Sequence, residues 1–413
     1  MDPPTPPRSP KQVRSSGNWS QVFPHHKTPA WLDGSSENTQ PEERGKDIDE
    51  QAVSPIIESS IEFDLSKDEN GRPVIFGEGA WSKVYKADTR TKLNSTTSAH
   101  GRLTPPGTPF KKGLPRHVAV KAPLCNTSRP ILRSEALILS LIQHTPQHEE
   151  FVVSFYGFVS AMDAIVLDAV PMSLSEHITS RNKLNRLKEF GGSGLASTDP
   201  ILGNISVWLD LAEKLVTALQ WLHETAQIVH GDIKLANILL SPKSGHQSDD
   251  VFHYTPLLID FSSSHSLSSP PNDPNTLSDP KSPLSPSSPL SAITREYTAP
   301  ELLSPTILRD PSSKPTTISD IFSLAITLLV CATGDLLVYS GNVWQRQHMA
   351  TQGWEVLGFV RNNVGESGWR VPEGGVVDRV IEGAVRRDER KRLAAREWRE
   401  GILREREAVA GVV

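Results

Sequence analysis

Three polar residues in the second half of the chain have the types and order that phosphate chemistry requires. Asp232 and Asn237 lie in the stretch HGDIKLANILL, and Asp260 follows in LLIDFS. A carboxylate can act as a base toward a hydroxyl, while a second carboxylate and an amide oxygen are ligands that Mg²⁺ accepts. Phosphoryl transfer needs alignment and charge neutralisation, which such groups supply. The set therefore indicates phosphoryl transfer, although a lone aspartate such as Asp232 is also typical of a capped turn.

A lysine and a glutamate earlier in the chain are candidates for holding a nucleotide. Lys121 ends the apolar run Val118-Ala-Val-Lys121, and Glu135 follows within the next segment of helical character. An ion pair between them would hold the ammonium group toward the phosphates of a nucleotide. Either residue alone is also typical of an exposed surface charge. The prediction of a nucleotide site therefore depends on both residues occurring together with Asp232 and Asp260.

Two glycines near the start of the first apolar region resemble a phosphate-binding loop. They occur in Gly77-Glu-Gly79-Ala-Trp-Ser82, and the residues that follow, SKVYKA, have strand character. In a dinucleotide-binding fold such glycines open a helix, which this continuation disfavours. An ordinary glycine-bearing hairpin fits the stretch as well as a nucleotide lid does.

The first half of the chain has mainly the residue pattern of β-strands. The glycine pair separates two short apolar runs within residues 73–87, which predicts a hairpin. Further strands are expected at 117–123, 152–159 and 164–170. These segments predict a sheet-bearing lobe.

Helices dominate the later pattern. Apolar residues at helical spacing occupy 129–142, where Pro130 marks the start, and 207–223. The apolar run after Asp320 is too short to cross a bilayer, and we interpret it as a buried helix. Strands followed by helices predict an α+β fold with a small sheet lobe and a larger helical lobe.

Composition narrows the classes of partner and compartment. The 413 residues include 48 acidic and 43 basic ones, for a formal net charge of -5, which gives no reason to expect a nucleic-acid or membrane partner. The first residues, MDPPTPPRSP, lack the apolar core of a signal peptide. Cys125 and Cys331 are far apart and form no metal-ligand spacing. An intracellular protein, cytoplasmic or nuclear, is expected.

Several segments have the composition of disordered or solvated chain. Residues 1–60 are rich in proline, serine and charge, and residues 91–116 and 262–290 have the same character inside the remaining sequence. We expect the last two to be insertions, because structureless loops of that length are uncommon in a compact domain. The mixed charges of residues 386–407 predict a solvated helix.

Taken in order, these motifs resemble those of eukaryotic protein kinases over residues 61–407, with a small lobe at 61–167 and a large lobe at 171–407. The resemblance implies a two-lobed kinase fold, ATP and Mg²⁺ as cosubstrate and cofactor, and proteins as substrates. It implies that ATP is bound by Gly77, Gly79, Val84, Lys121, Glu135, Asp168 and Val170. It implies catalytic roles for Asp232, Lys234 and Asn237, metal binding by Asn237 and Asp260, and structural roles for His230, Glu301, Asp320 and Arg392.

The kind of acceptor follows from the same resemblance. Lys234, two residues after Asp232, and the stretch from Thr294 to Ala299 are similar to the serine/threonine class. The serine- and proline-rich insertions together with HGD in place of HRD also resemble kinase-like proteins of fungi. Six sites that precede a proline are candidates for proline-directed kinases: Thr104, Thr108, Ser269, Ser282, Ser285 and Ser288.

The sequence departs from the family pattern at four positions. Phe76 and Ser82 are mild changes in the lid, and Ser262 replaces a glycine whose freedom permits inactive backbone conformers. Gly231 replaces an arginine that in the family is balanced by an activation-segment phosphate. A pseudokinase that binds partners without phosphotransfer, and a small-molecule kinase of related fold, are the alternatives. The complete set of catalytic residues disfavours the first, and the stretch Ala299-Pro300-Glu301 with Arg392 disfavours the second.

Overall fold

The structure is a computed structural model of the chain. It describes residues 56–90, 115–190, 199–242, 254–268, 290, 293–353, 355–362 and 368–411. The expected disordered segment 1–60 and the expected insertion 91–116 therefore lie outside the described residues, except at their ends. Glu58 forms a β-bridge with Phe158 of the small lobe. The structured part of the small lobe therefore begins before residue 61, the boundary that the sequence predicted.

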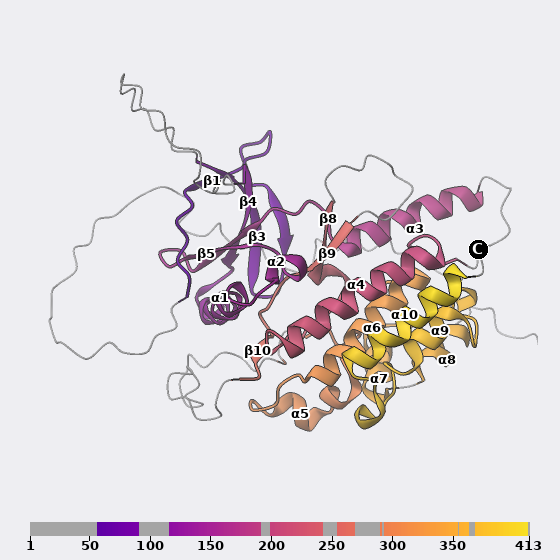
Figure 1. Ribbon diagram of the computed structural model, residues 1–413. Coiled ribbons are helices and arrows are strands. Elements are labelled where there is room, and N and C mark those ends of the chain that lie inside the picture. Colours follow the sequence, from indigo (N-terminus) through magenta and orange to yellow (C-terminus); the bar gives the residue numbers. More distant parts are fainter. Residues whose placement is uncertain are drawn as a thin grey trace, which may run out of the picture. The chain divides into compact units, whose positions relative to one another are not determined.

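A six-stranded antiparallel sheet forms the small lobe (Figure 1). Its order is β1-β3-β4-β6-β5, and β2 pairs with β3. The strands are β1 (Phe63–Leu65), β2 (Ile75–Glu78), β3 (Ser82–Thr89), β4 (His117–Pro123), β5 (Phe155–Val159) and β6 (Ala164–Asp168). The hairpin predicted over residues 73–87 is β2–β3, and the strands predicted from the later apolar runs are β4, β5 and β6.

One long helix packs against this sheet. Helix α1 (Arg129–Gln143) has Pro130 in its first turn, where a missing amide hydrogen costs nothing. Its buried face contacts β4, β5 and β6. Glu135 lies on this buried face, so α1 aims a carboxylate at the strands instead of at solvent.

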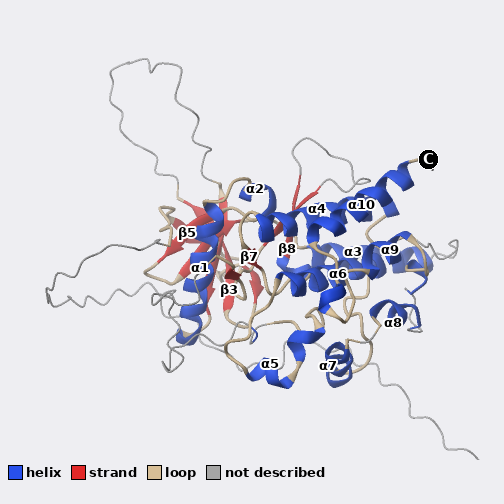
Figure 2. Ribbon diagram, turned by 60° about the horizontal axis from the view of Figure 1, so that its bottom comes forward, coloured by secondary structure: helices blue, strands red, loops and turns tan. Residues whose placement is uncertain are grey.

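The large lobe is helical, as expected, and its helices enclose a nearly fully buried one (Figure 2). The helices of this lobe are α3 (Leu174–Phe190), α4 (Ile205–Glu224), α5 (Pro305–Arg309), α6 (Thr317–Thr333), α7 (Val343–Gln352), α8 (Val356–Asn362), α9 (Val376–Glu382) and α10 (Ala395–Ala410). The short helix α2 (His148–Phe151) lies earlier in the chain, between α1 and β5. Helix α6 is the predicted apolar helix, and its residues from Ser319 to Thr333 are all buried. A helix that is apolar on every side is stable only when surrounded in this way. Within the described part of the chain, no helix is long and apolar enough to span a membrane.

Helix α6 has well-defined ends. The Thr316 hydroxyl accepts from the backbone of Ser319, and the Ser319 hydroxyl binds the Thr316 backbone, which forms a capping box. Gly334 ends the helix in a left-handed conformation with φ 83°. Because Asp320 lies in the first turn of this fixed helix, its carboxylate has a defined position beneath the loop that carries Asp232.

Two short sheets carry the loops of the site. β7 (Ile228–Val229) pairs with β10 (His265–Ser266), and β8 (Ile238–Pro242) pairs with β9 (Tyr254–Leu258). The first pair corrects one expected boundary, because residues 262–268 were assigned to a structureless insertion. Instead, His265 pairs with Val229, and the Ser264 hydroxyl donates to the carbonyl of His230 at 2.7 Å. Residues 269–289 of that insertion lie outside the described part.

The expected helix over residues 386–407 is correct only in its second half. Helix α10 begins at Ala395, and a 3-10 turn at Glu389–Lys391 precedes it. Arg392, between these two elements, is buried instead of solvated. Its environment, described below, explains why a charged residue is placed inside the protein at this point.

Candidate active site

Lys121 is the centre of a charge cluster in which Lys121 and Glu135 are buried and the Asp260 side chain is 34% exposed. It lies on the central strand β4, where it pairs with Val84 on β3 and Ile165 on β6. Its Nζ lies 2.7 Å from each carboxylate oxygen of Glu135, which is the ion pair expected from the sequence. The same Nζ lies 2.8 Å from Oδ1 of Asp260. One ammonium group therefore joins the sheet, α1 and the large lobe.

The three charges of this cluster set one another's ionisation. Burial acts to lower the pKa of Lys121, but Asp260 and Glu135 outweigh it and hold that pKa above its ordinary value. Burial likewise acts to raise the pKa of Asp260, yet Lys121 outweighs it and the pKa lies below its usual range. Burial, with Asp260 adding to it, raises the pKa of Glu135 to about 6 against the pull of Lys121. At neutral pH Lys121 is a cation and Asp260 is an anion.

The backbone at Asp260 has an unusual conformation that directs its carboxylate toward Lys121. Its φ is 64°, in the left-handed region that residues other than glycine rarely adopt. The next residue, Phe261, is buried, and its ring lies 4.9 Å from the ring of His230. The Phe261 amide donates to Oε1 of Glu135 at 3.2 Å. Asp260 is thus held between α1 and the loop of residues 230–237, which we call the catalytic loop.

Asp320 fixes the loop that contains His230 and Asp232. Its Oδ2 accepts from the His230 amide at 2.8 Å, and its Oδ1 accepts from the Gly231 amide at 2.9 Å. Nε2 of His223 on α4 lies 3.0 Å from Oδ2. Burial acts to raise the pKa of Asp320, but these hydrogen bonds and the two histidines lower it overall, so the carboxylate stays charged. The expected bracing contact is present.

Asp232 is surrounded by donors. Lys234 Nζ lies 2.5 Å from Oδ2, and the amide nitrogen of Asn237 lies 3.3 Å from the same oxygen. The Thr294 amide donates to Oδ1 at 3.0 Å, and the Thr294 hydroxyl accepts from Lys234 at 2.8 Å. Thr294 was not among the expected site residues. Its place in the stretch Thr294–Ala299 was the available signal, but a contact across the fold cannot be read from spacing.

The two expected metal ligands present a hard-oxygen donor set. The amide NH₂ group of Asn237 donates to the Asp232 carbonyl at 2.8 Å, which leaves its amide oxygen for a cation. Asp260 supplies a carboxylate that the neighbouring Lys121 keeps charged against the effect of burial, because Lys121 lowers the pKa of Asp260. The carbonyl of Asn237 accepts from the Ile259 amide at 3.0 Å, which ties the two ligand-bearing segments together. One carboxylate and one amide fit Mg²⁺, which takes few protein ligands when phosphates supply others.

Of the expected ATP-binding residues, Val84 on β3 pairs directly with Lys121, and Gly77 and Gly79 lie at the turn between β2 and β3. Gly77 pairs with Val84 across β2 and β3, and a Cβ at Gly77 would meet nothing within 4 Å. At Gly79 the amide donates to Ser82 at 2.9 Å and closes the turn. Val84 packs against the core, whereas the space beside Gly77 is open.

The segment expected to bind adenine, residues 167–170, lies at the end of β6 and connects the two lobes; we call it the hinge. The Asp168 amide donates to the Ser154 carbonyl at 2.9 Å, and its carboxylate accepts from the Ala169 amide at 3.0 Å. Val170 is partly buried against the core. These hydrogen bonds fix the backbone of the hinge where the chain passes from the sheet to the large lobe.

A second buried ion pair stabilises the far end of the large lobe. Arg392 binds Glu301 through two bonds of 2.6 Å, and its guanidinium stacks 5.0 Å from the Phe322 ring. Nε donates to the Arg386 carbonyl at 2.7 Å. Bidentate pairing and satisfied donors are what permit a buried arginine. The expected pair between Glu301 and Arg392 is present.

A protein-family comparison agrees with this arrangement. The protein kinase domain model matches residues 116–400. The chain belongs to the protein kinase family.

Among characterised proteins, this kinase is similar to the serine/threonine-protein kinase ISR1 of Saccharomyces cerevisiae. The two are 28% identical over 306 residues, which is 68% of this chain and 55% of that protein. The kinase thus spans about half the length of this curated relative. A yeast relative agrees with the fungal resemblance of the sequence.

The glycine that replaces the family arginine in this kinase has a steric role of its own. Gly231 has φ 84°, and a Cβ there would lie 2.5 Å from the carbonyl oxygen of Ser263 and 3.0 Å from Pro315. The sequence indicated only the loss of a cation at this position. The structure shows that glycine at this position also permits a left-handed turn that packs closely against Ser263, where a side chain would clash.

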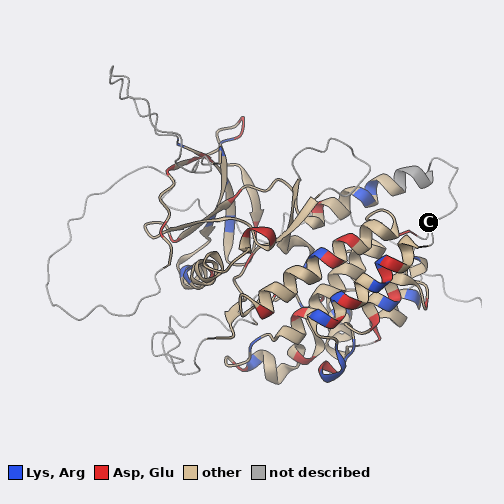
Figure 3. Cartoon of the chain, viewed as in Figure 1, with Lys and Arg blue, Asp and Glu red and all other residues tan. Residues whose placement is uncertain are grey.

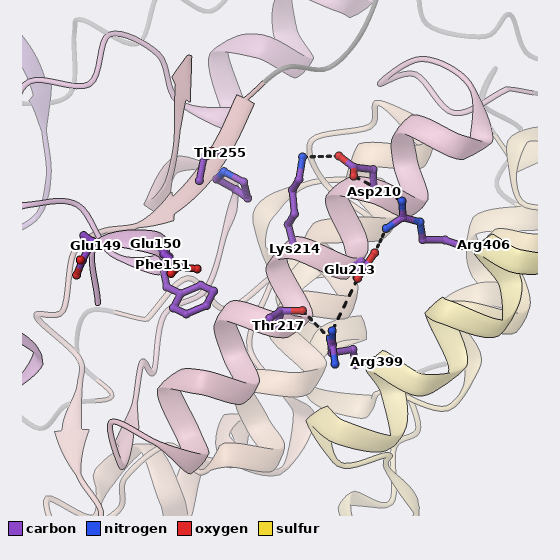
Figure 4. Close-up of a pocket in the computed structure, with 11 residues that line it drawn as sticks. Glu149, Glu150, Phe151, Asp210, Glu213, Lys214, Thr217, Thr255, Arg399 and Arg406 are labelled. Carbon is purple, nitrogen blue, oxygen red and sulfur yellow. Dashed lines mark hydrogen bonds and ion pairs between the residues drawn. The ribbon is translucent and has the colours of Figure 1, made fainter. Parts of the chain in front are cut away.

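A groove of about 580 Å³ lies away from these residues, between α2, α4, β9 and α10 (Figure 4). The charged side chains that α4 and α10 contribute to it form ion pairs. Lys214 contacts Asp210 at 2.5 Å, and Arg399 and Arg406 both contact Glu213. Figure 3 shows charges of both signs along α4 and α10. None of the lining residues belongs to the kinase site, so the groove is separate from it.

Proposed function

We propose that this chain is an active Mg²⁺-dependent kinase that transfers the γ-phosphoryl group of ATP to serine or threonine hydroxyls of proteins. The observation that carries the proposal is the assembled cluster of Lys121, Glu135 and Asp260 beside Asp232. In an assembled kinase the lysine–glutamate pair and the metal-binding aspartate must both be in place. Membership of the family supports phosphotransfer in general, and these contacts support activity in this chain.

The chain's own residues would divide the chemistry as follows. Lys121 would bind phosphate oxygens of ATP, with Glu135 holding it in place. Asn237 and Asp260 would hold Mg²⁺, which neutralises charge on the phosphates when bound. Asp232 would orient the acceptor hydroxyl and take its proton as the oxygen bonds to the γ-phosphorus and the bond to ADP breaks.

Lys234 and Thr294 support the choice of acceptor. Lys234 bridges Asp232 and the Thr294 hydroxyl, so its ammonium lies where charge would develop on the transferred group. The likeness of these residues to the serine/threonine class, and a serine/threonine kinase among the relatives, favour aliphatic hydroxyls over tyrosine.

The test is phosphate transfer from labelled ATP by purified protein with Mg²⁺, to itself or to a generic protein substrate. Asp232→Asn should remove transfer and leave ATP binding within about twofold of wild type, because the base is not an ATP ligand. Lys121→Met should weaken transfer through lost phosphate alignment, and Asp260→Asn is the control for the metal site. Wild-type protein that binds ATP with Mg²⁺ but transfers nothing would support the pseudokinase alternative instead.

A further inference from the structure

The chain that precedes β1 covers one edge of the small-lobe sheet. Strand β5 is the last strand in the order β1-β3-β4-β6-β5, so it forms that edge. Residues 56–61, which we call the strap, run beside it. The Phe158 amide donates to the Ile57 carbonyl at 2.8 Å, and the Ser59 amide donates to the Phe158 carbonyl at 2.8 Å. The strap is therefore bonded to the sheet by its backbone, as a covering segment on an edge strand is.

A glycine in β5 lets the strap lie this close to the strand. Gly157 has φ 115°, at a point where the register between β5 and β6 shifts. A Cβ at Gly157 would lie 2.6 Å from the backbone nitrogen of Ser59 and 2.8 Å from the carbonyl carbon of Glu58. These are backbone atoms, which cannot turn aside as the end of a flexible side chain can. Any residue larger than glycine would therefore push the strap away from β5.

The strap also binds α1, the helix that carries Glu135. The Ile57 amide donates to the hydroxyl of Ser140, a buried residue of α1, at 3.0 Å. The same hydroxyl donates to the Ala136 carbonyl at 2.8 Å, which fixes its orientation. Ser140 follows Glu135 by five residues, or roughly 7.5 Å along the helix axis. Ile57 thus bonds to β5 through its carbonyl and to α1 through its amide.

A second contact holds the opposite end of α1. Asp163, buried in the turn between β5 and β6, accepts from Arg133 Nε at 2.6 Å and lies 3.3 Å from the guanidinium of Arg129. Both arginine side chains are about half exposed, so solvent screens these ion pairs, whereas the Ser140 hydroxyl is shielded. Helix α1 cannot move away from β5, taking Glu135 with it, unless bonds at one of these ends break.

We propose that the strap positions Glu135 for phosphoryl transfer by tying α1 to β5. Ile57, Ser140 and Gly157 are then positioning residues, which act on the reaction through the bond between Glu135 and Lys121. The inference rests on the proposed function and adds the element that keeps its lysine–glutamate pair together. Because the strap belongs to the same chain as α1, this positioning requires neither a separate partner protein nor an added phosphate.

The experiment loosens the strap in the full-length protein in two ways. Gly157→Ala introduces the clash with the strap backbone, and Ser140→Ala removes the acceptor of the Ile57 amide. Gly71→Ala is the control for backbone strain, because Gly71 has φ 74° in the small lobe and a Cβ there meets nothing within 4 Å. Ser134→Ala is the control for the helix, because Ser134 is an exposed serine of α1. For each folded variant, kcat and KM for ATP are measured.

We expect both strap variants to lower kcat about tenfold, or ~1.4 kcal/mol of barrier, with KM for ATP within about twofold of wild type. The two controls should keep wild-type kcat. In a Glu135→Gln background, Ser140→Ala should lower kcat by less than about twofold, since a residue that acts through Glu135 has little left to affect. Losses that multiply in the double variant, or an unchanged kcat in Ser140→Ala, would overturn the inference and leave the proposed function standing.

Hydrogen exchange gives a result that needs no phosphate transfer. The amides of α1 should exchange about tenfold faster in Ser140→Ala and Gly157→Ala than in wild type, because α1 opens locally once the strap is released. They should exchange at the wild-type rate in Gly71→Ala and Ser134→Ala. Unchanged exchange in Ser140→Ala would overturn the inference even if Gly157→Ala does not fold. Faster exchange in a protein whose wild type transfers no phosphate would reject only the proposed function.

Discussion

Asp260 and Gly231 share a left-handed backbone, with φ 64° and 84°, but differ in what stands on it. At Asp260 the protein keeps a side chain in a conformation that costs of order 1–3 kcal/mol for a residue other than glycine. At Gly231 it has removed the side chain altogether. The difference indicates what each position is for. Asp260 provides a carboxylate to Lys121, whereas Gly231 provides its backbone amide, which donates to Oδ1 of Asp320.

Replacing Asp260 by glycine should have the largest effect. Asp260→Gly removes the backbone strain together with the carboxylate, and Glu135 continues to neutralise Lys121. We expect phosphotransfer to fall at least ~100-fold with a change in thermal unfolding of only a few degrees. Asp260→Asn, which tolerates the left-handed region, should lose transfer similarly. Activity retained in either variant would show that the strained conformation is unrelated to the proposed metal ligand.

The pH dependence should be large and centred on Glu135. Its pKa is raised to about 6, so toward pH 5 it takes up a proton and loses its ion pair with Lys121. We expect kcat/KM for ATP to fall below about pH 6, since that parameter reports ionisation of the free enzyme. Glu135→Gln should be less active at pH 7 and should lack this acid limb.

The stability of the protein should change in the opposite direction over the same range. The pKa of Glu135 in the folded state, about 6, exceeds its ordinary value of 4.5, so the ionised carboxylate costs stability above pH 6. That cost disappears as the pH falls toward 4.5. The unfolding free energy of wild type relative to Glu135→Gln should therefore rise between pH 7 and pH 5. A parallel loss of activity and relative stability would show that another group titrates.

A side chain at Gly231 should destabilise the protein by a moderate amount. Gly231→Ala imposes a left-handed conformation and a Cβ 2.5 Å from the Ser263 carbonyl oxygen. Gly71→Ala is a matched control, because Gly71 has φ 74° but a Cβ there meets nothing within 4 Å. We expect Gly71→Ala to cost about 1 kcal/mol and Gly231→Ala to cost about 2–3 kcal/mol, measured by denaturant unfolding. Equal costs would mean that the catalytic loop adjusts freely.

Phosphorylation of the activation segment should have the smallest effect on catalysis. Ser269, Ser282, Ser285 and Ser288 lie outside the described residues, and Gly231 offers no cation to a phosphate there. Changing all four serines to alanine should leave the transfer rate near wild type. A fall of tenfold, about 1.4 kcal/mol of barrier, would point to another cation. Arg295, which is exposed and bonded to Gln347, would be the first to replace.

The local pattern of apolar residues was sufficient to predict several helices and strands. Helix α4 follows from apolar residues at helical spacing, and helix α6 and strands β4 and β6 follow from continuous apolar runs, because such patterns indicate burial of one face or of every face. Strand β10 was missed, since its serine-rich surroundings have the composition of a loop. Its pairing with β7 and the Ser264 bond to His230 are non-local. The start of α10 at Ala395 was missed because the charges before it include the buried Arg392.

The sequence predicted which residues form the candidate site more fully than it predicted the contacts between them. The order of Lys121, Glu135, Asp232 and Asp260 indicated which residues belong together. The Lys121–Asp260 contact joins residues 139 positions apart, and the Thr294–Asp232 contact joins residues 62 positions apart. Spacing along the chain does not determine such contacts. The positive φ at Asp260 likewise depends on packing: aspartate adopts the left-handed region more readily than most residues, but the residue type alone does not select it here.

The bonds from Asp320 to the catalytic loop also bear on how the loop moves. The amides of His230 and Gly231 are bonded to a carboxylate on the most deeply buried helix, and His223 on α4 binds the same group. Opening either amide to solvent therefore requires displacement of α6, whose residues around Asp320 are buried. Such amides exchange their hydrogens only when the surrounding unit unfolds as a whole. We therefore expect the loop that carries His230 and Gly231 to have no separate melting transition and to exchange these two amide hydrogens only as the large lobe unfolds.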